Sequence, residues 1–501
     1  MRSSTSLRYF FALFLWLVLT GGALAQQRFW VAFPDKPGRA DENDCLNAVV
    51  SQAYLDSLQA RGLVVTAVSK WLNAAAVQGS PAQMAGLTNA TFVKETQPIT
   101  GYFQPTQTTA SLDLEFLAKA VDQLQPQALF DAQLTGKGVK IGVLDAGFYE
   151  APGKPGLAPL FAGNHVKAHR DFVNPTNQHF YTLRESLLDN HGTKVLERIG
   201  GYDSTRKALT GLATGADYYL ARTDHGGREN RLEEEKFVQA LEWLDSLGVK
   251  LVNSSLGYAT GFDDPMENYK PTQMDGSSFI ARAVQLAIEK KGMLIVVSAG
   301  NEGAIKSWQV IGTPADAAGT IAVGATDYDH WTRQGYSGMG PAFLPYLKPD
   351  LACFATDGTS FSAPIITGLT ACLLQANPSL TGVQLADILR KSGHLYPFGN
   401  NYVGYGVPNA GKALALALAP DKISEEKAPL QVTGTKFTFT LEKPLPAGSG
   451  GIVLFRKKSA TLVISQQKLS GNTKKINLKR LPGETHTTVQ MGDQVVEVVW
   501  Q

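Results

Sequence analysis

The chain has 501 residues, of which 44% are hydrophobic and 18% are charged. This is an ordinary globular composition, and it excludes a largely disordered or fibrous chain. The 46 basic and 44 acidic residues give a net charge of +2. Because no long block carries a single sign, nothing in the composition favours nucleic acid as a partner. At roughly 150 residues per domain, the length predicts about three domains.

The N-terminal residues have the pattern of an export signal. Arg2 and Arg8 precede an apolar stretch at 9–19, and the Ala-Leu-Ala sequence at 23–25 suits a signal peptidase. About a dozen apolar residues are too few to cross ~30 Å of hydrocarbon. We therefore expect 1–25 to be a cleaved signal peptide. The mature protein is then expected to be secreted, extracellular or periplasmic, with no membrane span.

The sequence offers no assured metal or cofactor site. Cys45, Cys353 and Cys372 can form at most one disulfide, and three buried thiols are the simpler interpretation. His165 and His169 lie four residues apart and could pair on a helix, but no third ligand accompanies them. No loop rich in Asp and Asn supplies the roughly six to eight oxygen ligands that calcium needs. We expect no cofactor and no metal.

Residues 26–110 are expected to form a small α+β module that ends in an exposed linker. RFWVAF and GLVVTAV are predicted strands, and the run from Asp44 to Arg61 is a predicted helix between them. The Thr-, Gln- and Pro-rich segment ITGYFQPTQTTAS indicates the linker.

Residues 111–420 alternate short β-branched runs with longer helical patterns. This rhythm predicts an α/β fold, a mostly parallel sheet with helices on both faces. VKIGVLD, KLVNSSLG and GMLIVVSAG are the clearest buried strands, and 231–247 has the apolar stripe of a helix that packs on the sheet. After Pro420 the helical patterns stop. Residues 421–501 are predicted to form a small all-β domain from KFTFTLE, GGIVLF, ATLVIS, KKINLK and QVVEVVW.

Three residues of this central region have the chemistry of serine hydrolysis. Asp145 ends the strand VKIGVLD, so its carboxylate is expected at the carboxyl edge of the sheet. His191 stands at a plausible helix start, and Ser360 stands at the head of the apolar helix SAPIITGLTACLLQ. A serine nucleophile needs an imidazole as base and a carboxylate to orient that imidazole. Taken singly, each residue also has a structural interpretation, as a turn residue, a structural histidine or a helix N-cap.

Five motifs occur together in the order found in subtilisin-like serine peptidases. DAGF resembles the Asp motif of that family, HGTKV its His motif, NSSLG its substrate-binding strand, SAGNEG its oxyanion-hole segment and GTSFSAP its nucleophile motif. The chain order Asp, His, Ser is also that of subtilisin. The chain thus resembles this family over about 136–420. The resemblance implies a subtilisin-like fold and an endopeptidase in which Asp145 orients the imidazole, His191 is general base and then general acid, and Ser360 is the nucleophile.

The same resemblance implies an oxyanion hole and a substrate groove. The side-chain amide of Asn301 and the backbone N–H of Ser360 would stabilise the oxyanion. Residues 255–257 would pair with an extended polypeptide substrate as an added strand. Residues 298–300 would form a wall of the pocket for the residue before the scissile bond, and their small size favours a large apolar side chain there. The substrate-binding residues implied are Ser255, Leu256, Gly257, Ser298, Ala299 and Gly300.

The resemblance also gives the N-terminal module a role. Many members of the family carry a small α+β pro-domain that inhibits the enzyme until it is cut away. Residues 26–110 are then the inhibitory pro-domain and its linker, with an autocatalytic cut between Ile99 and Asp113. A permanent accessory domain is the alternative. The expected partners are polypeptide substrates and the protein's own pro-domain, and the expected state is a monomer.

Two positions depart from the family pattern. Lys194 stands where the family usually has a second histidine, which is not a catalytic position. Only the nine residues Leu351–Thr359 separate Asp350 from Ser360, where the family usually has a longer Gly-rich loop. This shortening leaves a second hypothesis open, a catalytically inactive subtilisin-like binding module. A serine esterase and a zinc protease are disfavoured, since the chain has neither G-x-S-x-G nor H-E-x-x-H.

Overall fold

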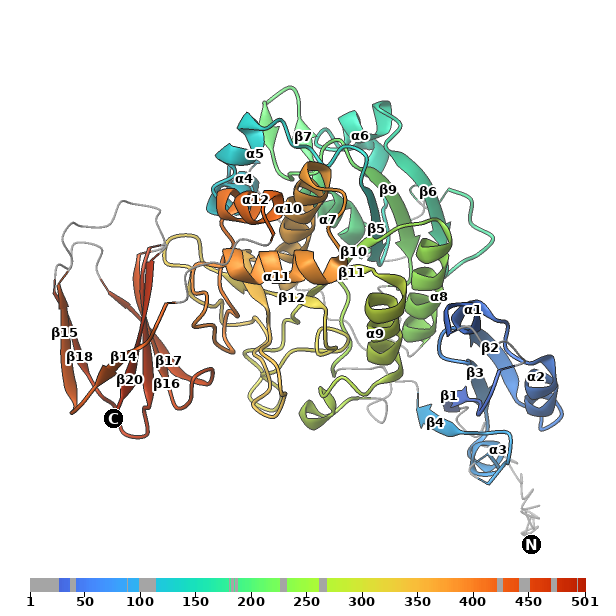
Figure 1. The fold of residues 1–501 in the computed structure, drawn as a ribbon. Helices are drawn as coiled ribbons and strands as arrows, with labels where there is room; N and C mark the ends of the chain where they lie inside the picture. The colour runs from blue at the N-terminus through green and yellow to red at the C-terminus, as the bar shows by residue number, and fades with distance from the viewer. Residues whose placement is uncertain are drawn as a thin grey trace, which may run out of the picture.

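Three modules lie in a row in the computed structural model (Figure 1). The N-terminal and C-terminal modules sit on opposite sides of a central α/β module. The expected signal peptide and the expected cut between Ile99 and Asp113 lie outside the described residues. The structure describes residues 27–36, 42–87, 89–98, 114–179, 181, 184, 188–225, 232–260, 268–420, 427–440, 451–469, 475–492 and 494–501.

The central module is built on a seven-stranded sheet in which all neighbouring strands run parallel. The strand order is β13-β12-β11-β10-β5-β9-β6. The predicted parallel sheet is confirmed, and the three strands predicted as buried supply β5, β10 and β11. The strands are β5 (Lys140–Asp145), β6 (Val166–Asp171), β9 (Asp217–Arg222), β10 (Leu251–Ser254), β11 (Leu294–Ser298), β12 (Ile321–Thr326) and β13 (Leu351–Phe354).

Helices cover both faces of this sheet, as predicted, because its strands are apolar on both sides. In β5, Val143 packs into one apolar cluster and Leu144 into the other. Within the described ranges, one segment is long and apolar enough to cross a membrane, Thr359–Ala376, and 83% of it is buried inside the protein. The helices on one face are α8 (Leu232–Ser246) and α9 (Phe279–Lys291); those in the other layer are α4 (Leu114–Gln123), α5 (Gln127–Asp131), α6 (Ala158–Ala162), α7 (His191–Gly200), α10 (Ala363–Ala376), α11 (Gly382–Ser392) and α12 (Ala410–Leu418).

Two predictions in or near this module need correction. His165 and His169 do not share a helix, because His169 lies in β6, which pairs with β9, and His165 directly precedes that strand. Nδ1 of His165 lies 3.4 Å from Oδ1 of Asp217. Cys353 and Cys372 are buried free thiols, whereas Cys45, in the N-terminal module, is only half-buried.

The N-terminal module is a four-stranded antiparallel sheet in the order β2-β3-β1-β4. Leu58 of α2 and Met84 of α3 pack against one face of this sheet. The α+β prediction for this region is confirmed. Its elements are β1 (Gln27–Ala32), α1 (Glu42–Asn47), α2 (Gln52–Gln59), β2 (Val64–Ser69), β3 (Ala74–Gly79), α3 (Pro81–Ala85) and β4 (Glu95–Pro98).

The single helix predicted from Asp44 to Arg61 was wrong, because the structure has two helices with a break after Asn47. The β-branched Val49 and Val50, weak helix formers, fall in the break. Ser51 takes the non-helical angles φ −58° and ψ 126°. Val50 is 6% exposed and joins the apolar core of the module. The helix is thus interrupted where the side chain of Val50 is buried in the core of the module.

The other face of this small sheet packs on α8 and α9. Trp30 of β1 is fully buried, and its ring stacks on that of Phe279 with centroids 5.7 Å apart. Val238 of α8 joins the same apolar cluster. At the rim, Arg282 of α9 donates to both carboxylate oxygens of Glu95, at 2.9 and 3.2 Å. The module therefore packs along two helices of the central module.

The C-terminal module contains a five-stranded sheet, β14-β20-β19-β16-β17, and a two-stranded pair, β15-β18. The all-β prediction is confirmed, but β14 and β19 were not predicted. The β19 sequence HTTVQM is mostly polar, yet its last five residues are buried. Polar side chains are accommodated there because they have hydrogen-bond partners: Thr488 Oγ1, for example, donates to Glu497 at 2.7 Å. The strands are β14 (Leu430–Val432), β15 (Lys436–Thr440), β16 (Ile452–Lys457), β17 (Val463–Leu469), β18 (Lys475–Lys479), β19 (His486–Met491) and β20 (Gln494–Trp500).

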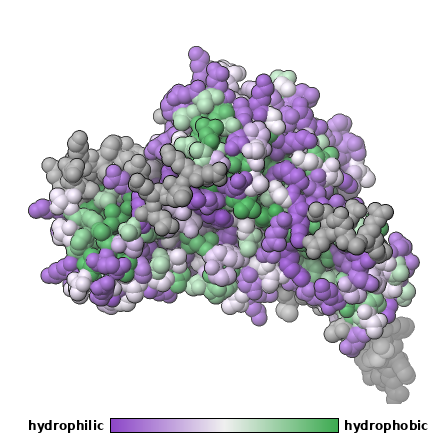
Figure 2. All heavy atoms as spheres, viewed as in Figure 1, coloured by the Kyte–Doolittle hydropathy of each residue, from purple (hydrophilic) through white to green (hydrophobic). Residues whose placement is uncertain are grey.

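Strand β16 is buried on both faces and joins this module to the central one. Leu454 points into the apolar core between the two small sheets, whereas Phe455 packs against Leu395 of the central module. Gln490 adds polar contacts by donating to the carbonyl oxygen of His330 at 2.9 Å and bonding Nε2 of His394 at 3.1 Å. Hydrophilic side chains cover most of the visible face of the protein, and apolar ones form patches on this module and on the central module (Figure 2).

We predict that Phe455→Ala lowers the free energy of unfolding by about 3–5 kcal/mol, since it leaves a cavity where a fully buried ring joins two modules. Urea unfolding followed by tryptophan fluorescence measures this. Ile464→Ala on the same module is the control, because that side chain is 42% exposed, and it should cost about 1 kcal/mol or less. Equal losses for both variants would contradict the packing described.

Candidate active site

The central strands of the sheet bring polar residues to one edge. Asp145 is the last residue of β5, Ser298 is the last residue of β11, and Ser255 follows β10, which lies between those strands. Because the carboxyl ends of parallel strands meet at the same edge, these residues lie near one another. Asp145 and Ser255 are fully buried, and Ser298 is nearly so. This is the edge where open α/β sheets hold their functional sites.

Asp145 and His191 form a short hydrogen bond at this edge. Nδ1 of His191, the first residue of α7, lies 2.6 Å from Oδ1 of Asp145. The same oxygen accepts the backbone N–H of Ala146 at 2.8 Å. Only 6% of His191 is exposed, so water has little access to the bond. A carboxylate beside Nδ1 keeps the proton on that nitrogen and leaves Nε2 as the acceptor.

Two glycines allow α7 to approach β5 so closely. A Cβ on Gly192 would lie 2.5 Å from the carbonyl oxygen of Gly147 and 2.8 Å from Cβ of Asp145. A Cβ on Gly147 would lie 2.7 Å from the carbonyl oxygen of Asp189. Contacts this short do not occur, so a side chain at either position would push the strand end and the helix apart. The glycines therefore permit the hydrogen bond between Asp145 and His191.

Ser360 lies in a single 3₁₀ turn, η5 (Thr359–Phe361), directly before α10. Its hydroxyl donates to the carbonyl oxygen of Ser255 at 3.1 Å, and the hydroxyl of Ser255 donates back to the carbonyl oxygen of Ser360 at 2.9 Å. The side chain of Asn253 donates to Oγ of Ser255 at 3.1 Å and accepts from Thr367 of α10 at 2.9 Å. These contacts hold the serine turn against the end of β10.

The imidazole of His191 lies beside this turn. Its ring centroid is 5.5 Å from that of Phe361, the residue after Ser360. The short segment Leu351–Thr359 forms β13 and then a tight turn in which Gly358 has φ 134°. The shortened loop thus leaves Ser360 in contact with the edge of the sheet.

Thr359 connects the serine turn to Asn301. Oδ1 of Asn301 accepts the backbone N–H of Thr359 at 2.9 Å and its hydroxyl at 3.1 Å. The backbone N–H of Gly300 donates to Oγ1 of Thr359 at 3.1 Å. Nδ2, the donor of the Asn301 amide, makes no hydrogen bond within the described part of the chain.

The backbone around Asn301 is also constrained. Its N–H donates to the carboxylate of Glu302 at 2.8 Å, and burial raises the pKa of that carboxyl group. Gly300 has φ +101°, a conformation that L side chains rarely adopt. The amide of Asn301 is therefore presented from a rigid turn.

The residues expected to bind substrate flank this site. Leu256 is fully buried in the apolar core, so only its main chain is available to a substrate. A Cβ on Gly257 would find its nearest neighbour, the carbonyl oxygen of Thr313, only at 4.0 Å, so there is open space beside that backbone. Ala299 is fully buried, and Gly300 is partly exposed.

No cluster of three or more His, Cys, Asp or Glu side chains that could hold a metal ion occurs among the residues the structure describes. Oδ2 of Asp145 is buried, and it makes no hydrogen bond with any residue that the structure describes. The chemistry available at this edge is that of a serine, an imidazole and a carboxylate.

A parallel sheet that carries these groups at its carboxyl edge defines an α/β serine hydrolase. Sequence comparison then gives the family. The model of the Subtilase family matches residues 136–406, more than half of the chain, and the chain belongs to this family. It is a subtilisin-like serine endopeptidase, so the predicted resemblance is confirmed. The model of the Peptidase S8 propeptide domain of Bacteroidota matches residues 39–112.

Individual relatives agree with this assignment. Subtilisin BL of Lederbergia lenta is 29% identical over 304 residues, which span 58% of this chain and 97% of that protein. Subtilisin E of Bacillus subtilis strain 168 is 27% identical over 303 residues, which span 58% of this chain and 70% of its own.

Two solved structures share the fold at low sequence identity. Fervidolysin from Fervidobacterium pennivorans, a keratinolytic enzyme related to subtilisin, aligns with 94% of this chain and 71% of its own, with a TM-score of 0.55 and 16% identity. The epidermin leader peptide processing serine protease of Staphylococcus aureus aligns with 78% of this chain and 99% of its own, with a TM-score of 0.54 and 16% identity.

Thr359 is a site residue that sequence analysis missed. Its place directly before Ser360 was visible, but only the structure shows its hydroxyl beside both Gly300 and Asn301.

We predict that Thr359→Val lowers kcat about tenfold with little change in KM, because the amide of Asn301 loses one anchor. Thr359→Ser keeps the hydroxyl and should stay within about twofold of wild type.

Steady-state kinetics on a chromogenic peptide measure both variants of Thr359. Equal kcat values for the valine and serine variants would show that the hydroxyl contact contributes nothing to the reaction.

Proposed function

We propose that the chain is made as an exported pro-enzyme and hydrolyses peptide bonds within polypeptides through an acyl-enzyme on Ser360. The observation that carries the proposal is the 2.6 Å contact between Nδ1 of His191 and Oδ1 of Asp145. The buried carboxylate orients the imidazole and stabilises the imidazolium that forms during the reaction. The four parts are the signal peptide 1–25, the pro-domain and linker 26–110, the peptidase domain 111–420 and the β domain 421–501.

In the proposed reaction, Nε2 of His191 takes the proton of the Ser360 hydroxyl as Oγ attacks the substrate carbonyl carbon. The hydroxyl first turns away from the carbonyl oxygen of Ser255, to which it donates in the free site. The imidazolium then protonates the leaving amine, and an acyl group remains on Oγ. Water, activated by the same imidazole, hydrolyses the acyl-enzyme and restores Ser360.

The tetrahedral oxyanion would be stabilised by Nδ2 of Asn301 and the backbone N–H of Ser360. Both donors are held before the substrate arrives, since Thr359 anchors Oδ1 of Asn301 and the serine turn is bonded to Ser255. Preorganised donors of this kind need no reorganisation as the charge develops. The amino end of α10 adds its dipole in the same direction.

An extended polypeptide would lie between two segments at the edge of the sheet. Residues 255–257 would pair with its main chain, with space for close approach beside Gly257. Residues 298–300 would form a wall of the pocket for the residue before the scissile bond. The mature enzyme would act as a monomer outside the cell or in the periplasm, and it would need no cofactor.

We predict that Ser360→Ala lowers casein hydrolysis by on the order of 10⁶-fold, because the nucleophile is lost while the fold remains. Intact mass of the exported protein is recorded in parallel. Wild type should lose roughly the first hundred residues, as far as the cut between Ile99 and Asp113, whereas the variant should keep its pro-domain.

Equal behaviour of the two proteins would contradict the assignment of Ser360. If neither protein cleaved casein and neither was shortened, the inactive binding module would be the better description of the chain.

The contact between the proposed pro-domain and α8 contains carboxyl groups that the pro-domain buries. Glu235 is 2% exposed, and burial raises its pKa to about 7. Thr66 of the N-terminal module donates to its Oε2 at 2.7 Å, and Arg28 lies 3.8 Å from its Oε1. Two helical turns further on, burial also raises the pKa of Glu242, which accepts from Ser69 at 2.7 Å.

Separation of the pro-domain returns Glu235 to water and towards its ordinary pKa of 4.5. The complex therefore holds the proton more tightly than the separated parts do. The affinity of the pro-domain for the enzyme is therefore greatest below pH 4.5 and falls as the pH rises through 7. We predict that the inhibition constant of the released pro-domain rises by on the order of tenfold or more between pH 5 and pH 8.

Glu235→Gln keeps the contact with Thr66 without the titration and should flatten this pH profile. Glu289→Gln, at an exposed position on α9, is the control and should leave the profile unchanged. A wild-type inhibition constant that is independent of pH would contradict the prediction.

A further inference from the structure

Arg222 is the last residue of β9, which lies between β5 and β6 in the sheet. The strand register places it level with Asp145 on one side and with Asp171 on the other. Its side chain is 2% exposed. A fully buried guanidinium group is costly unless each of its donors has a partner, so the groups that it contacts are informative.

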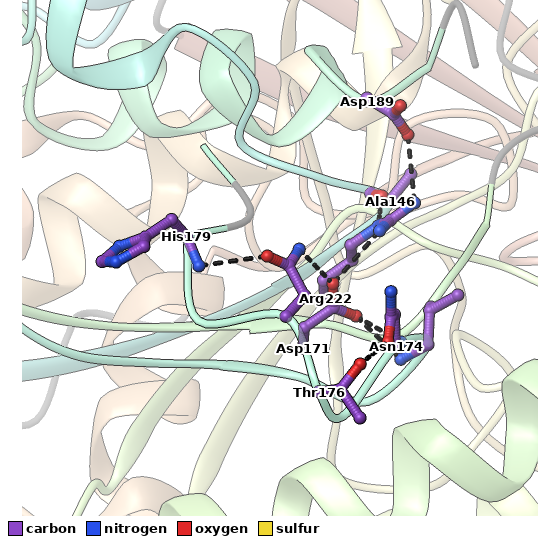
Figure 3. A network of polar contacts seen from close by, with 9 residues as sticks. Ala146, Asp171, Asn174, Thr176, His179, Asp189 and Arg222 are labelled. Atoms are coloured by element: carbon purple, nitrogen blue, oxygen red, sulfur yellow. Dashed lines mark hydrogen bonds and ion pairs between the residues drawn. The ribbon is translucent and has the colours of Figure 1, made fainter. Parts of the chain in front are cut away.

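Arg222 joins three separate segments (Figure 3). Its Nε donates to the carbonyl oxygen of Ala146 at 3.0 Å. One terminal nitrogen donates to Oδ2 of Asp171 at 3.1 Å, and the other donates to Oδ1 of Asp189 at 3.3 Å. Ala146 directly follows Asp145, and Asp189 lies two residues before His191. The guanidinium thus connects the backbone that carries the proposed orienting carboxylate to the segment that carries the proposed base.

The two aspartates are themselves anchored. The carbonyl oxygen of Asp189 accepts the backbone N–H of Tyr149 at 2.7 Å. Asp171 is 3% exposed, and its Oδ1 accepts the backbone N–H groups of Val173 and Asn174 at 2.9 and 2.8 Å. Figure 3 shows this second set of contacts continuing away from Arg222 towards His179. The guanidinium therefore contacts groups whose positions are already restrained.

The backbone of β9 supports the same connection. The N–H of Thr223, the residue after Arg222, donates to the carbonyl oxygen of Asp145 at 3.1 Å. Asp145 is thus held through its own carbonyl by Thr223, and the peptide that follows it is held through the carbonyl of Ala146 by Arg222. Arg222 and the hydrogen bond between His191 and Asp145 thus connect the same two segments, the end of β5 and the start of α7, at different points.

We propose that Arg222 is a positioning residue, which holds the segment after Asp145 and the segment before His191 at the separation that their hydrogen bond needs. The proposal rests on the catalytic roles assigned above to Asp145 and His191. Arg222 does not contact substrate, so its loss changes the rate of the chemical step and the pH profile of kcat rather than substrate binding. Displacement of a catalytic group by ~1 Å can cost about 10²-fold in rate.

The test compares Arg222→Met and Arg222→Lys with Arg456→Met. Arg456 is a matched control, because it is also buried, at 6% exposed, and is paired with a carboxylate, Glu484, at 3.3 Å in the C-terminal module. Full-length enzyme is matured, its active sites are counted by burst titration, and kcat, KM and the pH profile of kcat are measured on a chromogenic peptide.

For Arg222→Met we expect kcat per titrated site to fall about 10²-fold, KM to stay within about twofold, and the acidic limb of the pH profile to shift. Arg222→Lys keeps the charge but lacks the forked set of donors, so its kcat per titrated site should lie between those of Arg222→Met and wild type. Arg456→Met should keep both kcat per site and the pH profile. Wild-type kcat and an unshifted pH profile in Arg222→Met would overturn the proposal, and so would a change confined to KM.

If Arg222→Met does not fold, Asp189→Ala is the deciding variant, because it removes the acceptor through which Arg222 holds the segment before His191. A shifted pH profile with a reduced kcat supports the proposal, and an unchanged profile overturns it. Ser360→Ala, measured in the same series, distinguishes a failure of the proposed triad from a failure of the proposed role of Arg222. Activity that survives Ser360→Ala contradicts the triad, whereas an inactive Ser360→Ala beside an unimpaired Arg222→Met contradicts only the role of Arg222.

Discussion

The hydrogen bond between Asp145 and His191 is the constraint on which the site depends. It needs a strand end and a helix start to approach more closely than side chains usually allow, and the glycines at 147 and 192 make that possible. The parallel sheet supplies the strand end, because β5 has neighbours on both sides and ends level with them. The imidazole then lies beside the serine turn that leads into α10.

The remaining parts of the protein attach to this arrangement without altering it. Thr359 and Ser255 hold the serine turn between the segment around Asn301 and the end of β10. The N-terminal module packs on α8 and α9, on one face of the sheet, and α7 and α10 belong to the layer on the other face. The C-terminal module packs through β16. Each attached module is thus held by contacts of its own, apart from the proposed catalytic groups.

Much of the fold and the proposed triad could be predicted from the sequence, because the signals are local. VKIGVLD and GMLIVVSAG are apolar on both faces, which only a sheet covered on both sides accommodates. The nucleophile motif directly precedes an apolar helix. The features that were missed depend on tertiary partners: Val50 is buried where the predicted helix breaks, and the polar strand β19 is stabilised by contacts such as that of Thr488 with Glu497. An arginine that ends a strand, as Arg222 does, shows its partners only when the register is known.

The most direct test of the account is labelling of the matured protein with a fluorophosphonate probe, followed by peptide mapping, for wild type and His191→Ala. An oriented imidazole must activate the serine hydroxyl for the probe to react. The account predicts rapid, stoichiometric modification of Ser360 in wild type and little or none in His191→Ala. Modification of a different serine, or equal labelling of both proteins, would contradict the account.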